Sequence, residues 1–220
     1  METSLRPRLR NMAFLRLSYE MECTSGQYLS RDYERIASPI RGVENTGMDQ
    51  QAFFATGCFW GAERRFWNLP GVIKTSVGYM GGHTSNPTYK EVCSGTTDHA
   101  ETVEVIFDSE KISYQRLLEE FWTMHDPTSL NRQGGDIGTQ YRSAIFTTNE
   151  EQMIAAINTR EIYNEELKRE GFDDIVTEIQ DATGHTYWLA EEYHQRYLEK
   201  NPDGYDCHSS TGIAFPRVIK

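Results

Sequence analysis

The sequence lacks the features of a membrane protein or a nucleic-acid-binding protein. It contains no apolar run close to the roughly 18 residues that a membrane-spanning helix needs. Its 22 Lys and Arg residues are outnumbered by 33 Asp and Glu residues, which gives a formal net charge of -11. This is the wrong sign for a protein that neutralises phosphates. We therefore expect neither a membrane nor a nucleic acid among its partners.

Cysteines are few and lie far apart, at Cys23, Cys58, Cys93 and Cys207. No C-x-x-C pair and no series of Cys and His with zinc-ligand spacing is present, so we expect no metal and no other cofactor. The apolar stretch of a secretory signal is also missing, which favours a reducing compartment, the cytoplasm, where thiols stay available for chemistry.

The length favours one domain with an appendage, because 220 residues is about one and a half times the usual ~150. Residues 1–48 show neither strand nor helix periodicity, and we interpret them as a loosely ordered extension. Because this start is rich in arginine, an organelle targeting segment is the alternative. Residues 49–200 form the expected catalytic domain, and residues 201–220 form an irregular tail that contains Cys207.

Apolar periodicity and cap residues predict strands and helices after residue 50. The expected strands cover residues 52–55, 72–80, 102–107, 142–146 and 175–179. The expected helices begin after Cys58, Ser113 and Asn149, and a fourth spans residues 188–200. Since strands and helices mix without a regular βαβ order, we predict an α+β fold with a central mixed sheet. Two long connections, residues 78–100 and 127–141, interrupt this pattern and are expected to be functional.

Cys58 is the strongest candidate for chemistry. It follows a strand and a permissive glycine, and it begins a helix whose free N–H groups and dipole favour an anion. Such a position lowers the pKa of a thiol from its usual ~8.5. A buried, inert cysteine is the alternative, because free cysteines are among the most buried residues.

Several motifs in fixed order resemble those of the peptide methionine sulfoxide reductase A family, over residues 51 to about 198. They are Gly57-Cys58-Phe59-Trp60-Gly61, Gly78-Tyr79-Met80-Gly81-Gly82, Asn86-Pro87-Thr88-Tyr89, Val92-Cys93-Ser94-Gly95, His99-Ala100-Glu101 and Gly138-Thr139-Gln140-Tyr141-Arg142-Ser143. One departure is Asp98, where the family usually has Gly. We expect its carboxylate to raise the pKa of the neighbouring Glu101.

The resemblance implies a fold and a reaction. The fold is a two-layer α+β sandwich on a ferredoxin-like plait, and the reaction is reduction of the S epimer of methionine sulfoxide, free or in proteins. Cys58 would attack the sulfoxide sulfur, and Glu101, at a sheet edge facing the loop, would deliver a proton to the oxygen. The hydroxyls of Tyr89 and Tyr141 would hold that oxygen.

The resemblance also implies a substrate pocket. Phe59 and Trp60 would form an apolar wall for the S-methyl group, with core packing as the alternative for Phe59. Asp136 would join the hydrogen-bond network of the site, unless it only forms a turn.

A second thiol is needed to complete the cycle, because the sulfenic acid formed on Cys58 condenses with a nearby thiol. The tail around Cys207 resembles that of family members with one resolving cysteine, which implies a Cys58–Cys207 disulfide that thioredoxin then reduces. Cys93, expected to be small and buried, and Cys23 are weaker choices, and a plain surface thiol is the alternative for Cys207.

Two other functions stay open. One is a Cys-His hydrolase that uses Cys58 with His99, His125 or His185. The other is a module that binds oxidised methionine without reducing it.

The remaining polar residues receive ordinary interpretations. We expect His99 to anchor its loop by a hydrogen bond. The acids Glu165, Glu166, Glu191 and Glu192 are expected to lie on solvated helix faces.

Overall fold

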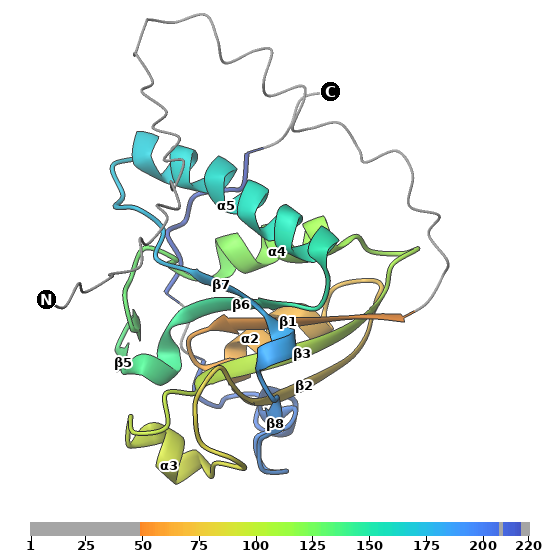
Figure 1. Ribbon diagram of the computed structural model, residues 1–220, viewed down its shortest axis with the longest axis vertical. Coiled ribbons are helices and arrows are strands. Elements are labelled where there is room, and N and C mark those ends of the chain that lie inside the picture. The colour runs from red at the N-terminus through yellow and green to blue at the C-terminus, as the bar shows by residue number, and fades with distance from the viewer. Residues whose placement is uncertain (1–48, 207–208, 217–220) are drawn as a thin grey trace, which may run out of the picture. The chain divides into compact units, whose positions relative to one another are not determined.

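The computed structural model describes residues 49–206 and 209–216. Six strands form one sheet in the order β7-β6-β1-β3-β2-β8 (Figure 1). They span Asp49–Thr56 (β1), Val72–Met80 (β2), Ala100–Asp108 (β3), Ser143–Thr147 (β6), Glu178–Asp181 (β7) and Trp188–Leu189 (β8). Every neighbouring pair is antiparallel except β6 and β7, which are parallel. The predicted central mixed sheet is therefore confirmed.

The helices that build the main core are α2 (Phe59–Trp67), α4 (Tyr114–Met124) and α5 (Glu150–Arg169). They contact one another and the sheet strands, and α4 and α5 lie together over one face of the sheet in Figure 1. Shorter elements are the helices α3 (Tyr89–Cys93) and α6 (Tyr197–Lys200), the 3-10 turns η1 (Thr139–Tyr141) and η2 (Ala182–Gly184), and the hairpin β4 (Arg132–Gln133) with β5 (Asp136–Ile137).

Both faces of the sheet are buried. Along β1, Ala52 and Phe54 belong to the main core, whereas Phe53 and Ala55 belong to a second, smaller apolar cluster. Successive side chains of a strand point to opposite faces, which explains this alternation. The smaller cluster is covered by the segment that contains Tyr187. From Ala52 onward strand β1 thus lies buried in the sheet, and it ends at Thr56, two residues before Cys58.

Local signals predicted most of these elements well. Strand β2 has the predicted limits, and α2 ends shortly before the Pro70-Gly71 pair. The Ser113 hydroxyl caps α4 by accepting from the Arg116 N–H, at 3.2 Å. The Asn149 side chain caps α5 in the same way, accepting from the Gln152 N–H at 2.9 Å. These caps are decided by neighbouring residues, so the sequence is enough to find them.

The predicted helix over residues 188–200 is wrong. Residues 188–189 are strand β8, and only Tyr197–Lys200 are helical. Between them the chain bonds to other elements, and Arg196 has a left-handed backbone with φ of 52°. The strand predicted over residues 175–179 is shifted to Glu178–Asp181. No helix within the described residues is long and apolar enough to span a bilayer.

Candidate active site

Cys58 lies at the junction of β1 and α2, as its sequence context predicts. It is the N-cap residue of α2 and only 6% of its surface is exposed. The preceding Gly57 has φ of +99°, in the region that favours glycine, and a Cβ there would lie 2.6 Å from Cγ of Gln133. Glycine at this position therefore allows both the turn that presents Cys58 and the close packing of the β4 strand behind it.

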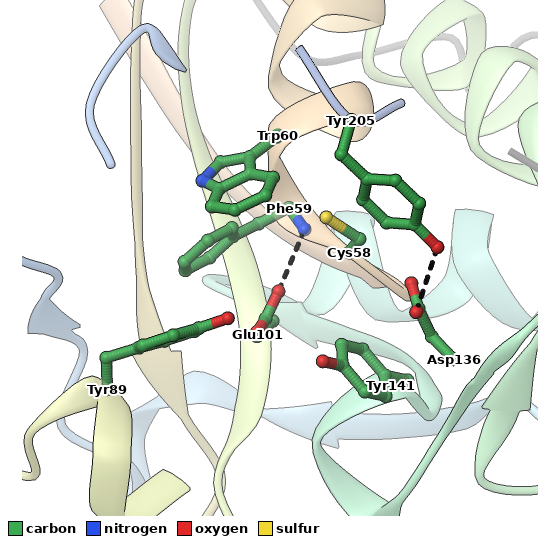
Figure 2. A pocket seen from close by; sticks show the side chains of 8 residues that line it. All are labelled: Cys58, Phe59, Trp60, Tyr89, Glu101, Asp136, Tyr141 and Tyr205. Carbon is green, nitrogen blue, oxygen red and sulfur yellow. Dashed lines mark hydrogen bonds between the residues drawn. The ribbon is translucent and has the colours of Figure 1, made fainter. Parts of the chain in front are cut away.

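The residues predicted to form the site come together around one cavity of about 170 Å³ (Figure 2). Its lining consists of Cys58, Phe59, Trp60, Tyr89, Glu101, Asp136, Tyr141 and Tyr205. These residues come from α2, α3, β3, β5, η1 and the tail. Tyr205 was not predicted. Cys207, the one predicted site residue missing from this lining, lies outside the described residues.

Glu101 is a deeply buried titratable group of the cavity. It is 2% exposed, and its Oε2 accepts a hydrogen bond of 3.0 Å from the backbone N–H of Phe59. Its pKa is raised to about 8, chiefly by burial; the hydrogen bond from the Phe59 N–H opposes the shift, and the negative charge of Asp136 adds to it. Glu101 is thus largely protonated at pH 7 and able to donate a proton next to Cys58.

Two expectations about Glu101 need correction. It does not lie at a sheet edge, because β3 is an inner strand between β1 and β2; it occupies the strand end that opens on the cavity. The neighbouring acid that raises its pKa is Asp136 rather than Asp98, whose side chain is exposed. Asp98 instead adopts φ of +57°, which Asp tolerates better than most residues where the family has Gly.

Tyr89 and Tyr141 face Glu101 from opposite sides. Figure 2 shows the hydroxyls of both turned toward the carboxyl group between them. Burial raises the pKa of both phenols, and for Tyr89 a hydrogen bond with the Cys93 side chain acts in the same direction. Both hydroxyls therefore keep their protons at neutral pH and can donate hydrogen bonds into the cavity.

Phe59 and Trp60 form an apolar wall beside Cys58. Phe59 belongs to the main core as well as to the cavity, so its two interpretations do not exclude each other. Trp60 stacks on Tyr197 with ring centroids 3.9 Å apart, and its indole N–H donates to Nδ1 of the buried His194 at 3.0 Å. Sequence reasoning missed both supporting residues, because they lie more than 130 positions further along the chain.

The tail reaches the cavity just before Cys207. Tyr205 donates a hydrogen bond of 3.0 Å from its hydroxyl to Oδ1 of Asp136. Asp206 forms an ion pair with Arg64 of α2. Asp136 therefore has partners beyond its own turn, and the residues directly before Cys207 are held at the cavity that contains Cys58.

Other predictions have mixed outcomes. His99 does anchor its loop: its Nε2 donates to the Thr84 carbonyl at 2.8 Å, and Nδ1 accepts from the Gly82 N–H at 3.0 Å. Cys93 is exposed, not buried, because its neighbour Val92 supplies the buried face of the short helix α3. Glu191 is not on a solvated face, since both its carboxylate oxygens accept hydrogen bonds.

The cavity offers a thiol, a protonated acid and phenolic donors, but no obvious metal site. Within residues 49–206 and 209–216, no three His, Cys, Asp or Glu side chains gather closely enough to hold a metal ion. This arrangement is typical of a class of protein, enzymes in which a thiol and a group able to donate a proton share a cavity on a mixed α+β scaffold.

Comparison with known proteins gives the family. Residues 50–218 match the family model described as peptide methionine sulfoxide reductase. The chain is 52% identical to the peptide methionine sulfoxide reductase MsrA of Pseudomonas putida over 183 residues, which are 83% of this chain and 82% of that protein. It is 54% identical to the human mitochondrial peptide methionine sulfoxide reductase over 171 residues, 78% of this chain and 72% of the human one. This chain therefore belongs to the peptide methionine sulfoxide reductase family.

A solved structure agrees with this assignment. Methionine sulfoxide reductase A of Corynebacterium diphtheriae is 44% identical and superposes with a TM-score of 0.70, over 81% of this chain and 86% of that chain. The similarity in fold supports the mixed α+β architecture.

Proposed function

We propose that this chain reduces the S epimer of methionine sulfoxide, free or within proteins, to methionine, with Cys58 as the nucleophile. Family membership supports the reaction. The observation that carries the mechanism is that Cys58 and the protonated Glu101 line the same small cavity.

In the first step the Cys58 sulfur attacks the sulfoxide sulfur, and Glu101 donates its proton to the sulfoxide oxygen. Proton delivery is needed because the oxygen is a poor leaving group when it is negatively charged. The oxygen, having taken the protons of Glu101 and of the thiol, leaves as water, and a bond between the two sulfur atoms remains. Water then attacks the Cys58 sulfur and breaks that bond, which releases methionine, returns a proton to Glu101 and leaves Cys58 as a sulfenic acid. Cys58 has been oxidised and the sulfoxide reduced by two electrons.

The remaining cavity residues bind the substrate. The hydroxyls of Tyr89 and Tyr141 hold the sulfoxide oxygen next to Glu101, as their orientation in Figure 2 suggests. The rings of Phe59 and Trp60 contact the S-methyl group. Asp136 takes part in the hydrogen-bond network through Tyr205. Together these contacts favour a small methyl sulfoxide over larger groups.

Cys207 resolves the sulfenic acid by forming a disulfide with Cys58 and releasing water, and thioredoxin then reduces this disulfide with its two thiols. The position of Tyr205 supports this assignment, because two further residues of chain span at most about 7 Å. The ion pair between Arg64 and Asp206 supports it as well. Cys93 is the weaker choice because it is held in the capped helix α3, and Cys23 because it lies outside residues 50–218, which match the family model.

A Cys-His hydrolase is disfavoured by the environment of the three candidate bases. His99, His125 and His185 are absent from the described cavity lining. His125 is buried between the Phe121 carbonyl and the Ser143 hydroxyl, at 2.7 Å from each. A module that only binds oxidised methionine would not need a buried acid kept protonated beside a thiol. Acyl-enzyme trapping without sulfoxide turnover would favour the hydrolase.

Finer features of the chain are proposed as follows. The order β6-β1-β3-β2, with α2 after β1 and α4 after β3, supports a ferredoxin-like plait as the core of the fold. We retain residues 1–48, 49–200 and 201–220 as extension, catalytic domain and tail. A cytoplasmic location is our proposal, with organelle targeting as the alternative that the mitochondrial relative supports.

One experiment tests the function directly. The reduced protein is incubated with each epimer of methionine sulfoxide, and free thiols are then counted. Loss of two thiols with the S epimer alone is expected; no loss with either epimer would exclude the proposed reaction.

The roles of the two cysteines are tested by substitution. Cys58→Ser should abolish reduction even with dithiothreitol present. Cys207→Ser should keep one stoichiometric turnover, accumulate a sulfenic acid that dimedone traps, and lose thioredoxin-dependent cycling. A disulfide from Cys58 to Cys93 or Cys23, found by peptide mapping of the oxidised wild type, would contradict the assignment of Cys207.

A further inference from the structure

Residues 190–196, which we call the strap, connect β8 to α6, and their His194 contacts the cavity residues Trp60 and Tyr89. Three hydrogen bonds fix the strap to the backbone of one residue of β2, Val77. The Ala190 N–H donates to the Val77 carbonyl at 3.0 Å, and the Gln195 side-chain amide bonds to both the N–H and the carbonyl of Val77, at 2.9 and 2.8 Å. At its far end the Arg196 N–H donates to the buried Glu63 of α2, at 2.9 Å.

Within the strap, Glu191 joins two elements that are distant in sequence. Its Oε2 accepts from the hydroxyl of Tyr79, a fully buried residue of β2, at 2.9 Å. Its Oε1 accepts from the backbone N–H of Tyr89, the first residue of α3, also at 2.9 Å. Burial alone would raise the pKa of Glu191, but these hydrogen bonds outweigh burial and lower it. The carboxylate is therefore charged at neutral pH and bonds strongly to both donors.

Helix α3 needs such support from outside. It has five residues, a length at which an isolated helix is unstable. Its capping box between Thr88 and Glu91 stabilises the first turn of the helix, but the hydrogen bonds of the box join only these two residues. Glu191 instead ties that turn to the sheet, and the strap touches the same residue again where His194 packs against the Tyr89 ring, with centroids 4.4 Å apart.

We propose that Glu191 is a positioning residue for Tyr89: its carboxylate fixes the start of α3 to β2 and thereby directs the Tyr89 hydroxyl toward the sulfoxide oxygen. This role rests on the proposed function of the cavity. Small displacements of a positioned group are costly for reaction rates, so loss of the carboxylate slows the step that the Tyr89 hydroxyl assists.

The test compares Glu191→Ala with a matched control, Glu192→Ala. The Glu192 side chain is 90% exposed and its carboxylate pairs with Lys200. Single-turnover oxidation of Cys58 by S-methionine sulfoxide should be about tenfold slower in Glu191→Ala and unchanged in the control. In a Tyr89→Phe background, Glu191→Ala should slow the reaction less than about twofold further, because the hydroxyl that it directs is already gone.

The outcomes separate this role from general stability and from the proposed function. Wild-type rates in Glu191→Ala overturn the inference, and so do rate losses that simply multiply in the double variant. If Glu191→Ala fails to fold, Tyr79→Phe serves as the second variant, because it removes one donor to the same carboxylate. It should slow single-turnover oxidation less than Glu191→Ala would, and it should cause no further slowing in a Tyr89→Phe background. A wild type that oxidises no thiol with either epimer overturns both proposals, whereas normal turnover with an insensitive Glu191 overturns this one alone.

Discussion

Replacement of Glu101 by Gln removes the proton donor and keeps the shape of the side chain. With an ordinary pKa of 4.5, a glutamic acid would be protonated in about one molecule in 300 at pH 7, whereas a pKa of about 8 keeps about nine in ten protonated. General acid help is worth about 10²- to 10⁴-fold. We therefore expect single-turnover oxidation of Cys58 by S-methionine sulfoxide to slow by at least about 10²-fold in Glu101→Gln, as measured by quenched thiol titration.

The pH profile checks the same reasoning. In the wild type the acid form of Glu101 is lost as pH rises through about 8, so its contribution to the rate should disappear above that pH. Asp136→Asn removes the charge that raises this pKa, so the loss should begin at lower pH. Asp98→Gly is the matched control, since this acid is exposed, and should leave the profile unchanged. An unchanged rate in Glu101→Gln would refute the role of Glu101 as proton donor. The same loss of rate at high pH in that variant as in the wild type would also refute it.

The stability of the fold should also depend on the protonation of Glu101. Because folding raises the pKa of Glu101, its neutral form stabilises the fold below about pH 4.5, and this contribution is lost as pH rises through about 8. As pH rises from about 4.5 to about 8, the free energy of unfolding of the wild type, measured with urea, should therefore fall relative to that of Glu101→Gln. A difference that is independent of pH would contradict the buried, protonated state.

Two further predictions concern the scaffold. Phe54 is fully buried and stacks on Phe66, so Phe54→Ala should lower the free energy of unfolding by about 3–5 kcal/mol. The control Ile73→Ala, at an exposed residue, should lower it by less than about 0.5 kcal/mol. Equal losses in urea unfolding curves would contradict the assigned core. Both Gly57 and Gly95 have positive φ, but only at Gly57 would an added Cβ also clash with Gln133. Gly57→Ala should therefore suppress sulfoxide turnover, whereas Gly95→Ala should not. Equal activities of the two variants would argue against close packing behind Cys58.

The sequence predicts those parts of the fold that neighbouring residues decide. The start of α4 depends on a hydroxyl and an N–H three positions apart, and the start of α5 depends on a similar pair. The short helix α3 was missed although its Thr88–Glu91 capping box is present in the sequence, because five residues give too little apolar periodicity to detect. Periodicity needs length, and the segments that form the cavity are short.

The site was predicted from motifs rather than from geometry. Cys58 and Glu101 lie in conspicuous runs, yet Glu101 is held beside Cys58 by its bond to the Phe59 N–H, a contact across 42 positions that the β1–β3 pairing makes possible. Tyr205 lies in the run around Cys207, but that run indicated a resolving cysteine and gave Tyr205 no role. Its hydroxyl reaches Asp136 across 69 positions, and no pattern in the tail indicates that contact.

The false helix at residues 188–200 has a physical cause that also explains the strap. A helix would use the Ala190 N–H and carbonyl within its own turns, but here that N–H bonds to Val77 of β2 and the carbonyl accepts from Gln195. The left-handed backbone of Arg196 then directs its N–H to Glu63. The bonds to Val77 and Glu63 connect the segment to β2 and α2, so contacts more than 100 positions away override the helical propensity of the segment.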